Sequence, residues 1–160
     1  MIRRHLVLVF AVVLLAPTRA VAAQDADRAA VLATVQKVFD AMRTRDTVLL
    51  LSAGDTSTRL VGIRERPGTP ASLSLTTLNQ FGAAFGRAPA GNVWNERIYD
   101  PEVRIDGPVA QVWAYYTFHL NDTFSHCGTD AFMLAKVGTE WKITQISDSR
   151  RTAGCTHTGK

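Results

Sequence analysis

The segment that decides the fold reads VAQVWAYYTFHL (109–120), FSHCGTDAFMLAKV (124–137) and EWKITQISDSR (140–150). The runs carry many β-branched and aromatic residues, which favour β-strands. The intervals between them are short and contain Asn121-Asp122 and Gly138-Thr139, residue pairs that favour two-residue hairpin loops. The sequence therefore predicts three consecutive antiparallel strands.

These turns also predict a register, with Leu120 opposite Thr123 and Val137 opposite Glu140. Side chains alternate across a strand, so the register assigns each residue to one face of the sheet. The face expected to meet the helices mixes large apolar with polar side chains, as the wall of a partly wet pocket does. Its members are Gln111, Trp113, Tyr115, Thr117, His119, His126, Gly128, Asp130, Phe132, Leu134, Trp141, Ile143, Gln145 and Ser147. The opposite face would carry Val112, Ala114, Tyr116, Phe118, Cys127, Thr129, Ala131, Met133, Thr144, Ile146 and Asp148.

The first 23 residues have the pattern of a secretory signal peptide. A basic start (1–5) precedes an unbroken apolar run (6–16), and small residues at 20–23 offer cleavage sites. The apolar run is too short to anchor the protein in a bilayer. We therefore expect a secreted or periplasmic protein, with no membrane attachment after cleavage.

The charge balance argues against a nucleic-acid partner. The chain has 18 Lys and Arg against 14 Asp and Glu, but Arg3, Arg4 and Arg19 belong to the predicted signal. The mature domain is therefore close to neutral, and its basic residues do not cluster except at Arg150-Arg151. Residues 24–155 are long enough for one domain with its own core, followed by a tail at 156–160.

Two cysteines, Cys127 and Cys155, occur in a chain with an export signal. In the predicted register Cys127 lies roughly opposite Arg150, so a disulfide is feasible if the tail turns back. The alternative is two free thiols. Two cysteines are too few for a zinc site, and we predict neither a metal nor a cofactor.

Upstream of these strands, three helices and further strands are expected. Helices are predicted over 25–45, capped by Asp25 or Asp27, over 46–51, and over 73–85. Apolar residues recur at helical spacing as one stripe in the first of them (Val31, Val35, Val38, Phe39 and Met42) and share a face in the third (Leu75, Leu78, Phe81 and Phe85). Short strands are predicted over 58–63, 93–99 and 102–106, the last two being interrupted at Asp100-Pro101. Helices followed by an antiparallel sheet predict an α+β domain. We expect three N-terminal helices on a strongly curved, mostly antiparallel sheet, which together form a cone with an open pocket.

This order of elements resembles the nuclear-transport-factor-2-like (NTF2-like) superfamily, which includes SnoaL-like cyclases and ketosteroid isomerase. The runs NERIYDPEVRIDGPVAQVWAYYTF (95–118), SHCGTDAF (125–132) and EWKITQISDSRR (140–151) are most similar to its lumazine-binding subfamily. The resemblance covers residues 26–155 and implies the cone fold. Because the superfamily contains catalysts, carriers and scaffolds, it does not imply one function.

Asp130, His126 and Tyr115 are the candidate catalytic residues. A carboxyl group against apolar walls has a raised pKa, so Asp130 could act as a base or a neutral donor. Candidate ligand contacts are side chains of the same predicted face: Trp113, Tyr115, Thr117, Phe132, Gln145 and Ser147. His119 is expected to face solvent near a hairpin tip.

The sequence leaves three classes of function open. The first is an exported domain that binds a small, flat, partly apolar molecule in the cone. The second is a SnoaL-like isomerase, cyclase or dehydratase that uses Asp130 with His126 or Tyr115. The third is an assembly module without a ligand.

The outer sheet face predicts a homodimer. Ala114, Tyr116, Ala131, Met133 and Ile146 would form an apolar patch there, and the resemblance implies the same sheet-to-sheet pairing. The alternative is a monomer whose outer face is shielded by Lys142 and Arg150.

Overall fold

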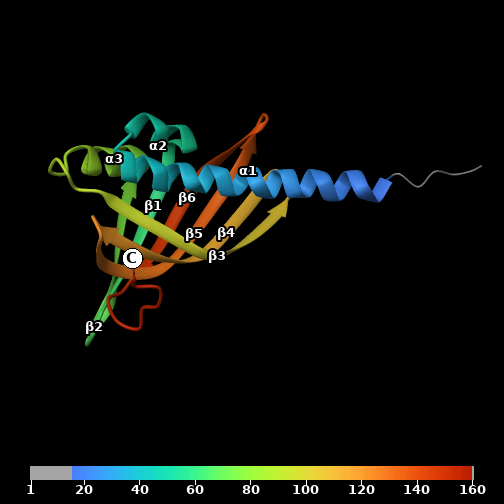
Figure 1. Cartoon of the computed structure of the whole chain (residues 1–160). Coiled ribbons are helices and arrows are strands. Elements are labelled where there is room, and N and C mark those ends of the chain that lie inside the picture. Colours follow the sequence, from blue (N-terminus) through green and yellow to red (C-terminus); the bar gives the residue numbers. More distant parts are fainter. Residues whose placement is uncertain (1–15, 160) are drawn as a thin grey trace, which may run out of the picture.

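Three helices cover one face of a six-stranded sheet in the computed structural model, which describes residues 16–159. Figure 1 shows the long first helix lying across the concave side of the curved sheet, with the two short helices at one end. The elements are α1 (Ala16–Thr44), α2 (Thr47–Ala53), β1 (Gly54–Arg66), β2 (Thr69–Thr77), α3 (Leu78–Gly86), β3 (Trp94–Asp106), β4 (Val109–Leu120), β5 (Thr123–Val137) and β6 (Glu140–Arg150). The strand order is β2-β1-β6-β5-β4-β3, parallel only between β1 and β6. The predicted α+β cone is confirmed.

The amino-terminal part of the chain differs from expectation within the described range. Helix α1 begins at Ala16, so neither Asp25 nor Asp27 is its cap. Instead Asp27 accepts hydrogen bonds from Lys136 Nζ (2.6 Å) and Trp141 Nε1 (3.1 Å). The predicted signal peptide (1–23) lies largely outside the described residues. Among residues 16–159, no helix is long and apolar enough to cross a membrane.

The predicted hairpin tips are correct, but the strands between them are not in a simple register. Leu120 pairs with Thr123 and Val137 with Glu140, as expected. One extra residue then enters β5, because His119 pairs with Phe124 whereas Phe118 pairs with His126. Such a β-bulge shifts the alternation by one residue. From Phe118 back to Val109, β4 therefore presents the opposite face from the one predicted.

A second bulge lies in β6. Leu134 pairs with Ile143 but Met133 pairs with Gln145, so Thr144 is the extra residue. Trp141 and Ile143 face the helices as predicted. Beyond the bulge the faces exchange, and Ile146 and Asp148 turn toward the helices in place of Gln145 and Ser147.

Residues 69–77 form β2, where the sequence predicted the start of a helix over 73–85. Leu73 and Leu75 alternate with Ser and Thr, and they pair with Ile63 and Val61 of β1. The helix α3 starts only at Leu78, after a capping box in which Thr77 and Gln80 exchange side-chain and backbone hydrogen bonds. The strand alternation over 69–77 and the capping box at Thr77 therefore outweigh the helical spacing of Leu75 and Leu78, and the helix begins later than predicted.

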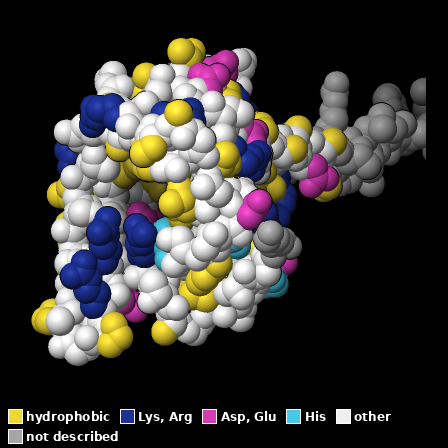
Figure 2. All heavy atoms as spheres, turned by 60° about the vertical axis from the view of Figure 1, so that its left-hand side comes forward, with side chains coloured by type: hydrophobic (Ala, Val, Ile, Leu, Met, Phe, Trp, Pro, Cys, Tyr) yellow, Lys and Arg dark blue, Asp and Glu magenta, His cyan; other side chains and the backbone are white. Residues whose placement is uncertain are grey.

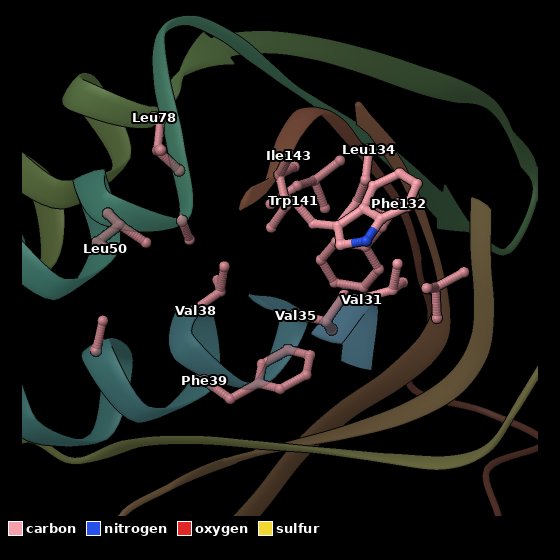
Figure 3. Packing of buried hydrophobic residues seen from close by; sticks show 14 of the residues in the cluster. Val31, Val35, Val38, Phe39, Leu50, Leu78, Phe132, Leu134, Trp141 and Ile143 are labelled. Carbon is pink, nitrogen blue, oxygen red and sulfur yellow. The ribbon is translucent and has the colours of Figure 1, made fainter. Parts of the chain in front are cut away.

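The core lies between α1 and the central strands. Val31, Val35 and Phe39 of α1 point toward Phe132 and Trp141, as Figure 3 shows. The rings of Phe39 and Phe132 meet edge to face at 6.0 Å. These contacts agree with the predicted helical stripe and with the predicted inward side of β5.

The outer sheet face differs from the predicted dimer patch. Ala114, Tyr116 and Ile146 are buried on the helix side, whereas Ala131 and Met133 do face outward. His119 also points outward but is buried beside Phe124, so its predicted solvent exposure is wrong. The homodimer itself stays a prediction.

The carboxyl-terminal tail folds back onto this outer face. A disulfide joins Cys127 to Cys155, which confirms the predicted pairing. Beyond it, Thr156 exchanges two hydrogen bonds with the Tyr115 hydroxyl, and the His157 ring stacks on Tyr99 at 4.2 Å. The bridge thus holds the tail against β3 and β4.

Two tryptophans provide a test of the observed faces. Trp141 is 3% exposed in the core, whereas Trp113 is 52% exposed on the outer face. We expect Trp141→Ala to lower the free energy of unfolding by about 3–5 kcal/mol, since it removes a buried aromatic side chain. Trp113→Ala should cost less than about 1 kcal/mol. Urea unfolding of both variants measures this, and equal losses would contradict the assigned register.

Candidate functional site

A cavity of about 660 Å³ opens between the downstream half of α1, α3 and the inner face of the sheet. Its walls are largely apolar and aromatic, with Phe39, Phe81, Trp94, Phe118 and Phe132 among them. Figure 2 shows the hollow from one side, with hydrophobic atoms visible inside it and Lys and Arg side chains gathered beside it. A concave, mostly apolar cavity with a few polar groups is typical of a small-molecule site.

Two carboxyl groups meet inside this cavity. Glu96 comes from β3 and Asp130 from β5, the strands on either side of β4, and their side chains are hydrogen-bonded to each other. Asp130 is only 2% exposed, and its Oδ2 has no hydrogen-bond partner within the described chain. A carboxyl pair of this kind holds at least one proton, because two ionised carboxylates in contact repel each other.

The surroundings keep this pair protonated. Burial raises the pKa of Glu96 to about 8, with a further contribution from the negative charge of Asp148. Burial, followed by the charges of Glu96 and Asp148, raises the pKa of Asp130 well above its usual range. The mutual hydrogen bond lowers the pKa of Glu96 and raises that of Asp130, so Asp130 holds the proton more tightly.

Asp148 is the third carboxyl group of the site. Burial raises its pKa, and the opposing effects of Arg150 and Arg64 are smaller. Both arginines line the cavity, and they are direct neighbours because Arg64 of β1 pairs with Arg150 of β6. The site therefore combines carboxyl groups with two adjacent guanidinium groups.

His126 lies in the cavity wall as a neutral ring. Burial, with the positive charges of Arg150 and Arg64, lowers its pKa to about 4. Its Nδ1 lies 3.0 Å from Ser125 Oγ, and the ring stacks on Phe118 at 4.8 Å. A neutral histidine can donate or accept a hydrogen bond here, but it does not supply positive charge.

Tyr116 also lines the cavity, but its hydroxyl is already engaged. Burial, with the nearby negative charges, raises the pKa of this phenol, which donates to the Ser149 carbonyl at 3.0 Å. That carbonyl passes over Gly128, where an added Cβ would lie 1.7 Å from it. Gly128 thus allows the backbone approach that holds the Tyr116 hydroxyl in place.

The structure brings together only some of the predicted site residues. Asp130, His126 and Phe132 line the cavity, as expected. The other predicted contacts, Trp113, Tyr115, Thr117, Gln145 and Ser147, lie on the opposite face, where the two bulges place them. The Tyr115 hydroxyl donates a hydrogen bond to the Thr156 carbonyl in the tail, and Thr117 Oγ1 lies 3.1 Å from the Tyr99 hydroxyl. Gln145 Nε2 donates a hydrogen bond to the Ser147 hydroxyl.

Sequence reasoning missed Glu96, Asp148, Arg64 and Arg150. Glu96 belongs to a strand that was predicted, but its partner Asp130 is two strands away in the sheet. Asp148 was assigned to the outer face because the bulge at Thr144 was not foreseen. A carboxylate between a tryptophan and an isoleucine on one strand face (Trp94, Glu96, Ile98) was the available signal for Glu96.

Comparison with known proteins identifies the fold. An NTF2-like protein with a cystatin-like fold from Novosphingobium aromaticivorans matches 92% of this chain and 96% of its own, at 11% identity and a TM-score of 0.66. An NTF2-like protein of unknown function from Silicibacter pomeroyi matches 80% and 98%, at 19% identity and a TM-score of 0.61. A "putative dehydratase" from the NTF2-like family of Streptomyces avermitilis matches 81% and 99%, at 15% identity and a TM-score of 0.57.

The chain therefore has the NTF2-like fold that its sequence resembles. No protein-family model matches the sequence, and no curated protein does. The similarity to the lumazine-binding subfamily stays a prediction.

The carboxyl pair predicts a particular dependence of stability on pH. The folded protein retains protons on Glu96 and Asp130 that the unfolded chain releases near the usual carboxyl pKa of 4.5 or 3.8. Their contribution to stability is therefore complete in acid and is lost as the pH rises toward about 8. His126 acts in the opposite direction, but only between about 4 and 6.5. Asp148, whose pKa is also raised, adds to the carboxyl effect.

We therefore expect the urea midpoint to fall between pH 6.5 and 8, where the His126 contribution no longer changes. Glu96→Gln should reduce this fall. Glu102→Gln, which removes an exposed carboxyl group from the outer face of the same strand, should leave it unchanged. A midpoint that rises over this interval, or equal slopes in the wild type and Glu96→Gln, would contradict the proton-holding pair.

Proposed function

We propose that this protein is an exported domain that binds a small, flat, partly apolar molecule in its cone. The observation that carries the proposal is Asp130 Oδ2, a buried polar atom without a partner in the described chain, in the wall of a cavity of about 660 Å³. A buried polar atom of this kind is costly unless a partner satisfies it. A ligand that donates to Oδ2, or exchanges a proton with the pair, removes that cost.

The apolar part of the cavity suits the body of such a ligand. Phe81, Trp94 and Phe118 form a chain of aromatic contacts, with ring centroids 6.1 and 6.2 Å apart in successive pairs. These three residues line the cavity together with aliphatic side chains of α1 and β1. Flat molecules pack well on such surfaces, because stacked and edge-to-face aromatic contacts add to the apolar area that is buried.

Export rests on the signal pattern at residues 1–23 and is supported by the disulfide between Cys127 and Cys155. Disulfides persist in oxidising compartments and are rare in the cytosol of most organisms. A secreted or periplasmic location is therefore part of the proposal.

Ligand occupancy can be measured directly on protein purified from the periplasm or the medium. Native mass spectrometry should show an added mass that disappears on denaturation, and the released compound can then be identified. Ala84→Trp places a large side chain in the cavity wall at an exposed position of α3 and should abolish the added mass without unfolding the domain. If the wild type carries no added mass, and a panel of flat bicyclic compounds leaves its melting temperature unchanged, the proposal is wrong.

A second candidate function is acid–base catalysis of the isomerase, cyclase or dehydratase type. It is favoured by the Glu96–Asp130 pair, because the pKa of Glu96 is raised to about 8, near neutral pH, and that of Asp130 is raised well above its usual range. On substrate binding, the Asp130 O–H would turn from Glu96 to donate a hydrogen bond to a carbonyl oxygen of the substrate, which leaves the Glu96 carboxylate free to accept a proton. Glu96, once ionised, would take a proton from the adjacent C–H and later return it. Glu96 thus replaces His126 and Tyr115 as the partner of Asp130 in this alternative.

Hydrogen exchange separates the two candidates once a carbonyl-containing ligand is identified. A catalyst transfers the ligand proton to Glu96, which exchanges with solvent, so NMR in D2O should show deuterium entering the bound ligand. The Glu96→Gln variant should then bind the ligand without exchanging its proton for deuterium. The Glu102→Gln variant should both bind the ligand and exchange its proton. Exchange at the uncatalysed rate with the wild-type protein would exclude the catalytic candidate and leave the binding domain.

A further inference from the structure

The two adjacent arginines at the cavity have no partner among residues 16–159 that explains their position. Arg64 and Arg150 pair across the only parallel strand contact in the described sheet, and both line the cavity. Neighbouring strands lie about 4.8 Å apart, so the two side chains start close together. Like charges in such a pair repel each other and destabilise the sheet. A negative group on this face would offset that repulsion.

The described part of the chain supplies little to do so. Among residues 16–159, neither guanidinium group makes a side-chain hydrogen bond or an ion pair, although other arginines do. Both arginines lower the pKa of Asp148, but burial opposes its ionisation more strongly. Glu96 and Asp130 contribute little negative charge near neutral pH, because they hold protons. Arg87, which also lines the cavity, adds a further positive charge.

The positions of these groups define an arrangement along the cavity. Arg64 is exposed and Arg150 is half-buried, whereas Asp130 is almost completely buried. The arginines therefore lie nearer to solvent and the carboxyl pair lies deeper. Figure 2 shows the same order, with Lys and Arg side chains beside the hollow and Asp or Glu atoms within it. The aromatic side chains of Phe81, Trp94 and Phe118 lie in the wall between α3 and β4.

We propose that the ligand of the cone is an organic anion, whose acidic group is held by Arg64 and Arg150 while its apolar body enters the cavity. This inference rests on the proposed binding function and names the chemical class of its ligand. A carboxylate, sulfonate or phosphate group fits two guanidinium groups, because each presents parallel N–H donors in a planar fork. The negative group also removes the repulsion between the arginines. A polar atom at the other end of the ligand would reach Asp130.

Two fluorescent probes with the same aromatic skeleton test this inference. The anion 8-anilinonaphthalene-1-sulfonate and the neutral N-phenyl-1-naphthylamine differ only in the sulfonate group. We expect the anion to bind the wild-type protein at least about tenfold more tightly, since charge-assisted hydrogen bonds are roughly twice as strong as neutral ones. This preference should decrease as salt is added, because ions screen partly exposed charges.

Variants then locate the charge that produces the preference. Arg64→Gln and Arg150→Gln should each weaken binding of the anion about tenfold and leave the neutral probe unaffected. Arg59→Gln is the matched control, because Arg59 is exposed on the opposite face of the same strand. Ala84→Trp should weaken both probes, which places them in the cavity. Unchanged circular dichroism and melting temperatures show that the glutamine variants are folded.

The outcomes distinguish this inference from the function on which it rests. If both probes bind in a manner sensitive to Ala84→Trp, but with equal affinity or without response to the arginine variants, the cavity binds ligands and the anion inference is wrong. If neither probe binds the wild-type protein, the cavity does not take flat apolar molecules, and both proposals are overturned. A preference that Arg59→Gln removes as strongly as Arg150→Gln does would also overturn the assignment to this pair.

Discussion

A single extra residue in β5 determines which side of β4 faces the cavity. The bulge next to Phe118 sets Tyr116 and Phe118 against the helices, and it turns Trp113 and Tyr115 outward. The bulge at Thr144 does the same for β6 and brings Asp148 and Arg150 to the inner face. Without these two shifts, Glu96, Asp148 and Arg150 would lie on the face opposite Asp130. The chemistry of the site therefore depends on two local irregularities of hydrogen bonding.

The sequence predicted the features that depend on residues close together in the chain, namely the turns and the buried face of the first helix. The turns at Asn121 and Gly138, both with positive φ, are short and specific, and the hairpin tips are as expected. The apolar stripe of α1 also identifies its buried face. The bulges could not be predicted in the same way. The free energy that a bulge costs is small compared with that of the tertiary packing that favours it. A single bulge then moves a whole strand segment to the wrong face.

The candidate site was predictable only in part, for a related reason. Asp130 stood out because it is a carboxylate within an apolar strand, and it does line the cavity. Glu96 is recognised as a site residue only through its hydrogen bond with Asp130, which lies 34 positions later in the sequence and two strands away. Arg64 and Arg150 become neighbours only through the parallel contact between β1 and β6. Pairings between distant strands leave no periodic pattern in the sequence.

The carboxyl pair also has an energetic cost that the rest of the domain has to offset. A buried carboxyl group next to a half-buried one, with an Oδ2 that has no partner in the described chain, reduces stability compared with apolar residues of similar size. Carboxyl groups with strongly perturbed pKa values cluster at functional sites. The core at the other end of the cone provides the compensating stability, because Val31, Val35 and Trp141 are almost fully buried there.

Helix α1 connects these two parts of the molecule. Its upstream residues Val31 and Val35 belong to the core, whereas Val38, Phe39 and Met42 belong to the core cluster and also line the cavity. One continuous apolar stripe therefore packs against the sheet at one end and forms a ligand wall at the other. The curvature of the sheet makes this possible, because the hairpin end of β1 and β2 lies far from α1 (Figure 1). The space left between them is closed only partly by the short helix α3, which leaves the mouth beside Arg64 and Arg87 open to solvent.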